Sequence, residues 1–293
     1  METKDALKDM MQSGEGIVTR TNTTLADTDF IHLYDASNNV MRITKAEFQK
    51  AMAAEYFRRA PLTDFDLSVL QQAAADQNLE KYGLQVGDKK TINGRTYIIA
   101  DMNTMKGTGT YRVSTNHVGL IVLPSDTQAW NVSGKTDEGA DNRGAGYANS
   151  DLHYYLVNTL LPQVQGDLGT SHLLAHKKRF TNTVNPSGYN RLGTDSGCSS
   201  NSEWIDNQYI SALSEVQMYG GTIWSSSGYD TGEACRQLEV FKKISHTFIF
   251  ESISIWLRDV VSASRAAIAN SGGIASSTSV SNAYYVAALI LYK

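Results

Sequence analysis

An Asn-Gly pair at positions 93 and 94 places the strongest constraint on how this chain folds. The pair stands between two short runs of strand-forming residues, Lys89–Ile92 and Arg95–Ala100. Both turn residues tolerate positive φ, which a tight two-residue hairpin turn requires. The pair therefore predicts an antiparallel hairpin. From Gly83 onward the chain continues as strands separated by glycine-rich turns, so we expect antiparallel strands, few helices and long loops.

Three further segments of this region are expected to be strands: Val118–Leu123, Lys177–Thr183 and Tyr284–Tyr292. The last is nearly all apolar, as in a strand that is buried on both faces. One helix is expected over Asp151–Leu161, where Leu152, Tyr155, Leu156 and Leu160 share a face. We expect Asn149 or Ser150 to cap this helix and Pro162 to help end it. A long polar loop is expected over Asn185–Ser202.

The first 60 residues have the pattern of a smaller, separate segment. Two alternating runs, Phe30–Tyr34 and Val40–Ile43, flank five small polar residues and predict a second hairpin. Thr44 and Glu47 then form a capping box at the start of a helix that Pro61 ends.

A second helix is predicted from about Asp66 to Tyr82, before Gly83. Its apolar stripe is narrow, which leaves two alternatives: the helix packs on its own domain, or it bundles with copies of itself. We therefore expect an N-terminal segment over residues 1–60, a connecting helix over 61–83 and a C-terminal domain over 84–293.

Composition and charge exclude several classes of partner. The chain has 26 basic and 30 acidic residues, for a net charge of −4, and so has no general electrostatic attraction for nucleic acid. Its longest apolar stretch, Ala283–Tyr292, is about half as long as a membrane helix, so no membrane insertion is expected. Cys198 and Cys235 match no metal-binding spacing; whether they form a disulfide stays open. We expect no metal and no cofactor.

The chain lacks the common catalytic motifs, GxSxG, the P-loop and GxGxxG. His172 and His176 have the i, i+4 spacing of metal ligands, but no acidic partner stands at a matching position, and we interpret them as two solvated histidines. We therefore expect a protein that is not an enzyme. The alternative is a glycan-cleaving enzyme that draws its acids from Asp230, Glu233 and Glu251.

Aromatic residues in polar, glycine-rich loops point to a binding function. Rigid aromatic rings beside adaptable polar groups provide contact area at low entropic cost, as in surfaces that recognise glycans and proteins. The predicted ligand-binding residues are Trp224 and Tyr229, which would stack on the ligand, and Arg236, which would donate charged hydrogen bonds. Trp256 and Arg258 are assigned to the core instead, with Arg258 in an internal ion pair.

Two parts of the N-terminal segment, Leu25–Ile31 and Val40–Phe48, carry a resemblance to known proteins. The second part contains Ile43-Thr44-Lys45-Ala46-Glu47-Phe48. Together they resemble a segment near the N-terminus of phage tail-fibre, head-fibre and collar proteins. The resemblance covers about 30 residues and implies attachment to other virion proteins, or trimeric assembly on a virion.

The C-terminal part resembles uncharacterised domains of phage and bacterial surface proteins, which are similar to C-type-lectin-like folds. The matching pieces are Asn149–Leu156, Leu213–Gly220 and Ile255–Arg258. The family commonly has Ser after its Trp-Leu-Arg, where this chain has Asp259. The resemblance implies an α+β fold with a short hairpin-helix anchor and a compact C-type-lectin-like head that binds through its loops.

The two resemblances imply a phage virion protein of the fibre or decoration type. Such a protein would be a homotrimer at the particle surface, with its N-terminal segment on capsid or tail and its head on a host-surface glycan or protein. Two alternatives remain: a virion-associated glycan-cleaving enzyme, and a purely structural decoration protein that binds no receptor.

Overall fold

The structure is a computed structural model of the chain. It describes residues 30–34, 40–44, 61–106, 113–136, 138–143, 146–184, 199–224 and 236–293. The chain divides into two units, Met1–Ala60 and Pro61–Lys293. In the first unit, strands β1 (Phe30–Tyr34) and β2 (Val40–Thr44) pair antiparallel, which confirms the N-terminal hairpin. The helix expected after Thr44 lies outside the described residues.

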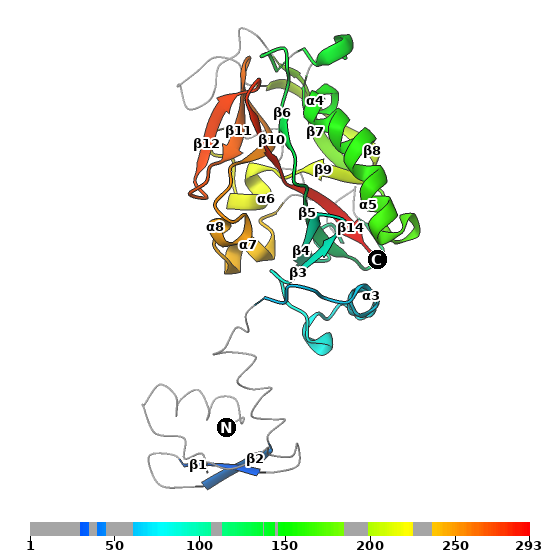
Figure 1. Cartoon of the computed structure of the whole chain (residues 1–293), viewed down its shortest axis with the longest axis vertical. Helices are drawn as coiled ribbons and strands as arrows, with labels where there is room; N and C mark the ends of the chain where they lie inside the picture. Colours follow the sequence, from blue (N-terminus) through cyan, green and yellow to red (C-terminus); the bar gives the residue numbers. More distant parts are fainter. Residues whose placement is uncertain are drawn as a thin grey trace. The chain divides into compact units, whose positions relative to one another are not determined.

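The second unit is a mixed α+β structure with mostly antiparallel sheets and few helices, as predicted (Figure 1). One five-stranded sheet has the order β3 (Lys89–Ile92), β4 (Arg95–Met102), β5 (Val118–Leu123), β14 (Ala288–Tyr292) and β9 (Ile210–Ala212). The other has the order β12 (Ala275–Ser279), β11 (Arg265–Ala269), β10 (Ile255–Ser262), β13 (Ala283–Val286) and β6 (Thr127–Ala129). Only β10 and β13 pair in parallel among these described strands.

The end of the chain joins the two sheets. A single buried strand was expected over Tyr284–Tyr292, but Ala287 separates it into β13 in one sheet and β14 in the other. The carbonyl of Ala287 accepts a hydrogen bond from the backbone N–H of Leu213 at 3.1 Å. Every residue of β14 is buried. The prediction of a core strand is therefore confirmed for β14, while its division between two sheets depends on contacts that are distant in sequence.

The Asn-Gly turn forms as predicted between β3 and β4, with φ of 49° at Asn93 and 79° at Gly94. Asp167, which lies far from this hairpin along the chain, stabilises it through hydrogen bonds. Its carboxylate accepts hydrogen bonds from Asn93 Nδ2 at 2.8 Å and from Arg95 Nε at 2.7 Å. Burial alone would raise the pKa of Asp167, but the hydrogen bonds from Arg95, Tyr97 and Asn93 outweigh it and lower this pKa.

The expected helix begins as predicted but does not end as predicted. The hydroxyl of Ser150 caps α4 (Asp151–Tyr155) by accepting from His153 N at 3.0 Å. A π-helical segment, η4 (Leu156–Leu160), then leads directly into α5 (Leu161–Leu168). Pro162 lies in the first turn of α5, where a missing N–H breaks no hydrogen bond within that helix, so the prediction that it helps to end the helix is wrong.

The predicted connecting helix is α3 (Leu67–Asp76), followed by the short η1 (Glu80–Tyr82). The two are separated at Gln77, whose backbone is left-handed with φ of 56°. Leu70, Ala73 and Ala74 are fully buried in the core cluster that also contains residues of both five-stranded sheets. Of the two alternatives, α3 therefore packs on its own unit.

The strand expected over Lys177–Thr183 is confirmed as β7 (His176–Val184), which pairs with β8 (Ser199–Gln208). β8 begins inside the segment expected to be a loop, and residues 185–198 lie outside the described part. The remaining helices are short: η2 (Ala140–Asn142), η3 (Tyr147–Asn149), η5 (Thr170–His172), α6 (Glu215–Tyr219), α7 (Glu239–Lys243) and α8 (His246–Ile249). Across the described residues, none of the helices combines the length and apolar character that crossing a membrane requires.

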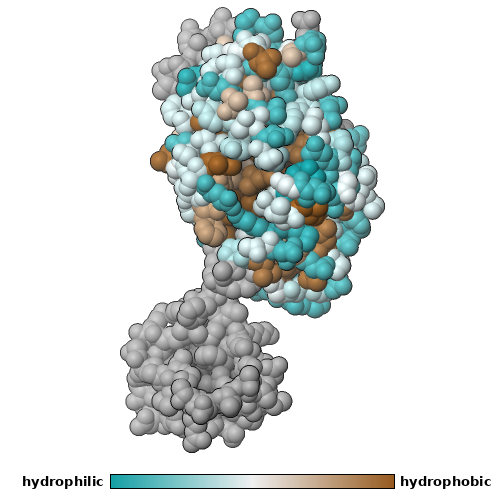
Figure 2. All heavy atoms as spheres, in the orientation of Figure 1, coloured by the Kyte–Doolittle hydropathy of each residue, from teal (hydrophilic) through white to brown (hydrophobic). Residues whose placement is uncertain are grey.

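The face of the second unit shown in Figure 2 is mostly polar, with apolar residues in small patches. The large apolar side chains that are exposed in the described part are Leu62, Val132, Tyr154, Ile223, Phe248 and Ile274. Trp256, in contrast, is fully buried, which confirms its assignment to the core, and Arg258 is also buried.

Candidate ligand-binding surface

The structure places Trp224 just after α6, partly buried against the hydrophobic core. Its backbone N–H donates to the two carboxylate oxygens of Glu215 at 3.0 and 3.3 Å, and Ile223 N donates to Glu215 Oε2 at 3.1 Å. Glu215 is fully buried at the start of α6, and its own N–H donates to Asp259 Oδ2 at 2.7 Å. Residues 223–224 are thus fastened to the interior by a buried carboxylate, which we call the Glu215 clamp.

Arg236 forms an ion pair with a carboxylate of strand β4. Its Nη2 donates to Oδ1 of the buried Asp101 of β4 at 2.9 Å, and its Nη1 lies 3.6 Å from Glu239 Oε1. Burial raises the pKa of Asp101 to about 6, although the charge of Arg236 opposes this rise. The guanidinium therefore compensates a buried carboxylate. Tyr229, the third predicted ligand-binding residue, lies outside the described residues.

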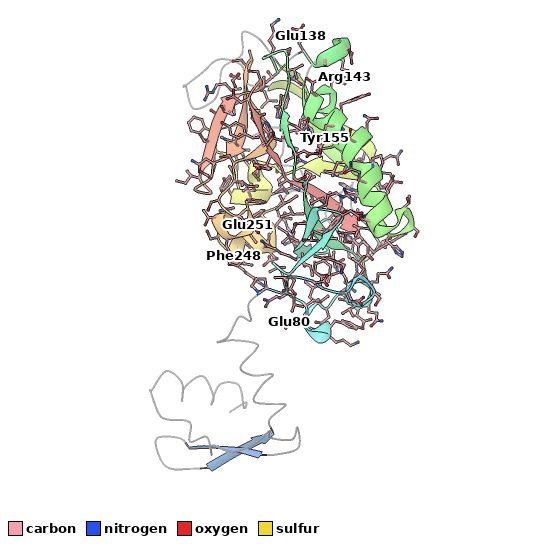
Figure 3. The ribbon with its side chains drawn as sticks, in the orientation of Figure 1. Glu80, Glu138, Arg143, Tyr155, Phe248 and Glu251 are labelled. Atoms are coloured by element: carbon pink, nitrogen blue, oxygen red, sulfur yellow. The ribbon has the colours of Figure 1, made fainter. Side chains whose placement is uncertain are left out.

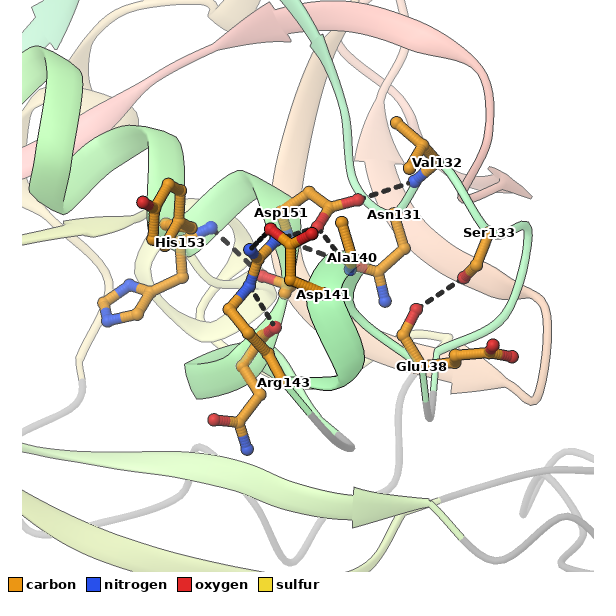
Figure 4. Close-up of polar contacts among 12 residues, drawn as sticks. Asn131, Val132, Ser133, Glu138, Ala140, Asp141, Arg143, Asp151 and His153 are labelled. Carbon is orange, nitrogen blue, oxygen red and sulfur yellow. Dashed lines mark hydrogen bonds and ion pairs between the residues drawn. The ribbon is translucent and has the colours of Figure 1, made fainter.

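A second carboxylate fastens the loop that follows β6. Asp151, at the start of α4, accepts hydrogen bonds from Val132 N and Ala140 N, each at 2.8 Å, and forms an ion pair with Arg143 (Figure 4). Its own N–H donates to Asn131 Oδ1 at 2.8 Å. These contacts, which we call the Asp151 clamp, bring both ends of the 131–143 loop to one side chain.

Further contacts close the same loop. Ser133 Oγ donates to the carbonyl of Glu138 at 2.5 Å (Figure 4). Lys135 Nζ pairs with the Glu138 carboxylate at 2.8 Å. At Gly139 a Cβ atom would lie 2.2 Å from the carbonyl oxygen of Asn149, so only glycine fits at this position. The described part of the loop is therefore connected by hydrogen bonds and an ion pair among its own residues and packs closely against Asn149.

The Asp151 clamp supports an exposed aromatic side chain that sequence reasoning missed. The guanidinium carbon of Arg143 lies 4.3 Å from the ring centroid of Tyr154 on α4, and 51% of Tyr154 is exposed. Arg143 also contacts Asp141, with Nη1 3.4 Å from Oδ2. The signal was present in the sequence, because Tyr154 falls outside the apolar stripe predicted for its helix.

Buried aromatic residues lie under this surface. His153 is buried with its ring centroid 4.9 Å from that of Tyr147, and Trp130 is fully buried with Nε1 donating to the carbonyl of Leu257 at 3.3 Å. Burial, and secondarily the charge of Arg258, lowers the pKa of His153 to about 4. His153 is therefore neutral at pH 7, and the clamp rests on a packed interior.

The structure also describes some of the candidate catalytic acids and the two histidines with metal-ligand spacing. Glu251 is 79% exposed and pairs with Lys89 at 3.0 Å, while Asp230 and Glu233 lie outside the described residues. His176 is buried at the start of β7, so its interpretation as a solvated side chain is wrong; His172 is partly exposed, with Nδ1 2.6 Å from Gln71 Nε2.

Within the described ranges, no group of three or more His, Cys, Asp or Glu side chains could hold a metal ion. Cys198 and Cys235 both lie outside those ranges. The fastened loop with Arg143 and Tyr154 is therefore our candidate ligand-binding surface. Comparison with protein-family models, with curated proteins and with solved structures finds no match to this chain.

Proposed function

We propose that the protein is a phage virion protein of the fibre or decoration type whose Pro61–Lys293 unit binds a host-surface glycan or protein through its loops. The observation that carries the proposal is the pair of carboxylate clamps. Asp151 and Glu215 each accept hydrogen bonds from backbone amides of a connecting segment. Loops held rigidly on a β-sheet core lose little conformational entropy when they bind a ligand.

The use of these carboxylates supports binding in preference to glycan cleavage. A glycosidase needs two carboxyl groups that face the substrate, one of which is a proton donor. Asp151 and Glu215 instead face backbone amides, and the exposed Glu251 is paired with Lys89. A glycan-cleaving enzyme that uses Asp230 and Glu233 remains the alternative.

The attachment part of the proposal rests on the N-terminal segment. β1 and β2 form a hairpin in the stretch that resembles the attachment segments of phage fibre and collar proteins. We propose that this segment docks on capsid or tail proteins, that the chain assembles as a homotrimer, and that its second unit is C-type-lectin-like. The mixed α+β architecture and the loops supported by a β core agree with such a head domain.

The test combines binding, mass and activity measurements on the full chain. An array of bacterial capsular polysaccharides and lipopolysaccharides should retain the protein on a subset of spots, without release of reducing sugar. Release of reducing sugar from a bound polysaccharide would establish the enzymatic alternative. A trimer that binds no spot and no intact host cells would favour a purely structural decoration protein.

Light scattering tests the assembly part of the proposal. The shortened chain for comparison should begin at Pro61, because a start at Gly83 would remove Leu70, Ala73 and Ala74 from the core. We expect a trimer for the full chain and a monomer for residues 61–293. Two monomers would refute assembly through the N-terminal segment.

A further inference from the structure

We infer that Tyr154, Arg143 and Asp141 form a subsite for one uncharged pyranose ring of a glycan. The inference rests on the proposed function and deepens it, because it names the class of ligand and the residues that would hold it. It differs from the sequence prediction, which assigned binding to Trp224, Tyr229 and Arg236.

One face of the Tyr154 ring is available for stacking. Arg143 covers the other face, with its guanidinium carbon 4.3 Å from the ring centroid, yet 51% of Tyr154 is still exposed. The exposed area lies on the parts of Tyr154 that Arg143 does not cover, and we infer that the opposite face of the ring is among them. The C–H face of a pyranose is apolar and flat, and it is complementary to an open aromatic ring with a polar hydroxyl at one end.

The stacking surface is also held in place before a ligand arrives. Arg143 Nη2 pairs with Asp151, and Arg143 Nε donates to the carbonyl of Asn149 at 3.4 Å. Asp151 is in turn fixed by backbone amides at both ends of the loop. A ring supported in this way needs little reordering on binding, which favours affinity even for a small contact area.

Asp141 supplies hydrogen-bond acceptors beside the aromatic ring. Its side chain is 90% exposed, and its Oδ2 lies 3.4 Å from Arg143 Nη1. The left-handed backbone at Asp141, with φ of 57°, is one that Asp adopts more readily than most residues. The carboxylate can accept hydrogen bonds from two sugar hydroxyls while it keeps its contact with Arg143.

The charges of the surface favour a neutral sugar over an acidic one. The cations of the described loop are already paired, Arg143 with Asp141 and Asp151, and Lys135 with Glu138. A uronic or sialic acid would bring a further carboxylate next to Asp141, and the repulsion between the two negative charges would disfavour binding. We therefore assign the subsite to a neutral hexose or N-acetylhexosamine.

The experiment is saturation-transfer NMR on the full chain with glucose, galactose, mannose and N-acetylglucosamine as separate probes, and with glucuronic acid as the charged comparison. We expect transfer to at least one neutral sugar and none to glucuronic acid. Tyr154→Ala should weaken the binding by about tenfold or more, as expected for removal of a central aromatic contact. Asp141→Asn should weaken binding less, because an amide keeps one acceptor oxygen.

Phe248→Ala is the matched control. Phe248 is 54% exposed, lies on the short helix α8 with Lys89 Nζ 5.9 Å from its ring centroid, and is far from Arg143 (Figure 3). This variant should bind like the unsubstituted chain. If Tyr154→Ala keeps full binding to polysaccharide spots, the subsite is wrong while the proposed function stands. If the unsubstituted chain binds neither spots nor sugars, the subsite is wrong, and the proposed function is wrong as well if intact host cells are not bound either. Preference for glucuronic acid would overturn the neutral assignment.

Discussion

The Asp151 clamp and the Glu215 clamp use the same chemistry at different depths. Both carboxylates begin a short helix, and both accept hydrogen bonds from two backbone amides of a neighbouring segment. Glu215 is fully buried, and Trp224, which it holds, packs against the core. Asp151 is 14% exposed and pairs with Arg143, whose guanidinium supports the exposed Tyr154.

The two clamps therefore fasten segments at different depths, one against the hydrophobic core and one at the surface. At the Glu215 clamp the fastened aromatic residue, Trp224, is partly buried against the hydrophobic core. At the Asp151 clamp the fastened loop keeps an aromatic ring and an arginine in place at the surface. An aromatic side chain is therefore a candidate for ligand binding only where the structure leaves it exposed, as it does for Tyr154 on α4.

The largest expected effect tests whether Trp224 belongs with the core. Trp256 is fully buried, and its Nε1 donates to the carbonyl of Gln128 at 2.8 Å. We expect Trp256→Ala to lower the free energy of unfolding by about 3–5 kcal/mol, because it leaves a large cavity. Trp224→Ala should cost about 1–2 kcal/mol, since its side chain is only partly buried. Urea unfolding followed by circular dichroism measures the loss of unfolding free energy in both variants. Equal losses would show that Trp224 contributes to the core as much as Trp256 does.

The next largest expected effect is the difference in stability between variants that remove the Glu215 clamp and variants that remove the Asp151 clamp. Glu215→Ala leaves two amides without their acceptor in a buried setting, so we expect a loss of about 2–4 kcal/mol of unfolding free energy. Asp151→Ala should cost only about 1–2 kcal/mol, because water can reach the freed amides. Amide hydrogen exchange gives an independent measure, since Val132 and Ala140 should lose protection in Asp151→Ala alone. A larger loss of unfolding free energy for Asp151→Ala than for Glu215→Ala would contradict this prediction.

The smallest effect is the net pH dependence of two buried groups, one beneath the Asp151 clamp and one on β4. His153 has its pKa lowered from 6.5 to about 4, so its contribution to stability is lost as pH falls through this range. Asp101 has its pKa raised from 3.8 to about 6, so its contribution rises over nearly the same fall. Because the two oppose each other, we expect them to change the unfolding free energy together by less than about 1 kcal/mol between pH ~4 and ~6.

Single variants separate the two contributions. Relative to the unsubstituted chain, the free energy of unfolding of His153→Gln should rise as pH is lowered from about 6 to about 4, because the opposing contribution of His153 is removed. Relative to the same reference, that of Asp101→Asn should fall over the same range. Urea titrations at several pH values measure the two slopes, and slopes of equal sign would show that one of the two pKa shifts has the wrong direction.

The candidate surface could be predicted from the sequence only in part. Tyr154 could have been singled out because it lies off the apolar stripe of its helix. The contact of Tyr154 with Arg143 could not be predicted, because it depends on how the segment that contains Arg143 packs against α4. The sequence also could not show that Arg236, a predicted ligand-binding residue, forms an ion pair with Asp101, which lies 135 residues earlier in the chain.

The sequence by itself determined the elements whose signals are local. Asn93-Gly94 specified the β3–β4 turn because both residues reach positive φ, and Ser150 specified the start of α4 because its hydroxyl accepts from an amide three residues on. Tertiary structure alone decided the passage of the helix through Pro162, the division of the last strand at Ala287 and the exposure of Tyr154. Those features depend on packing and on hydrogen bonds between residues far apart in the chain, which no local pattern of residues encodes.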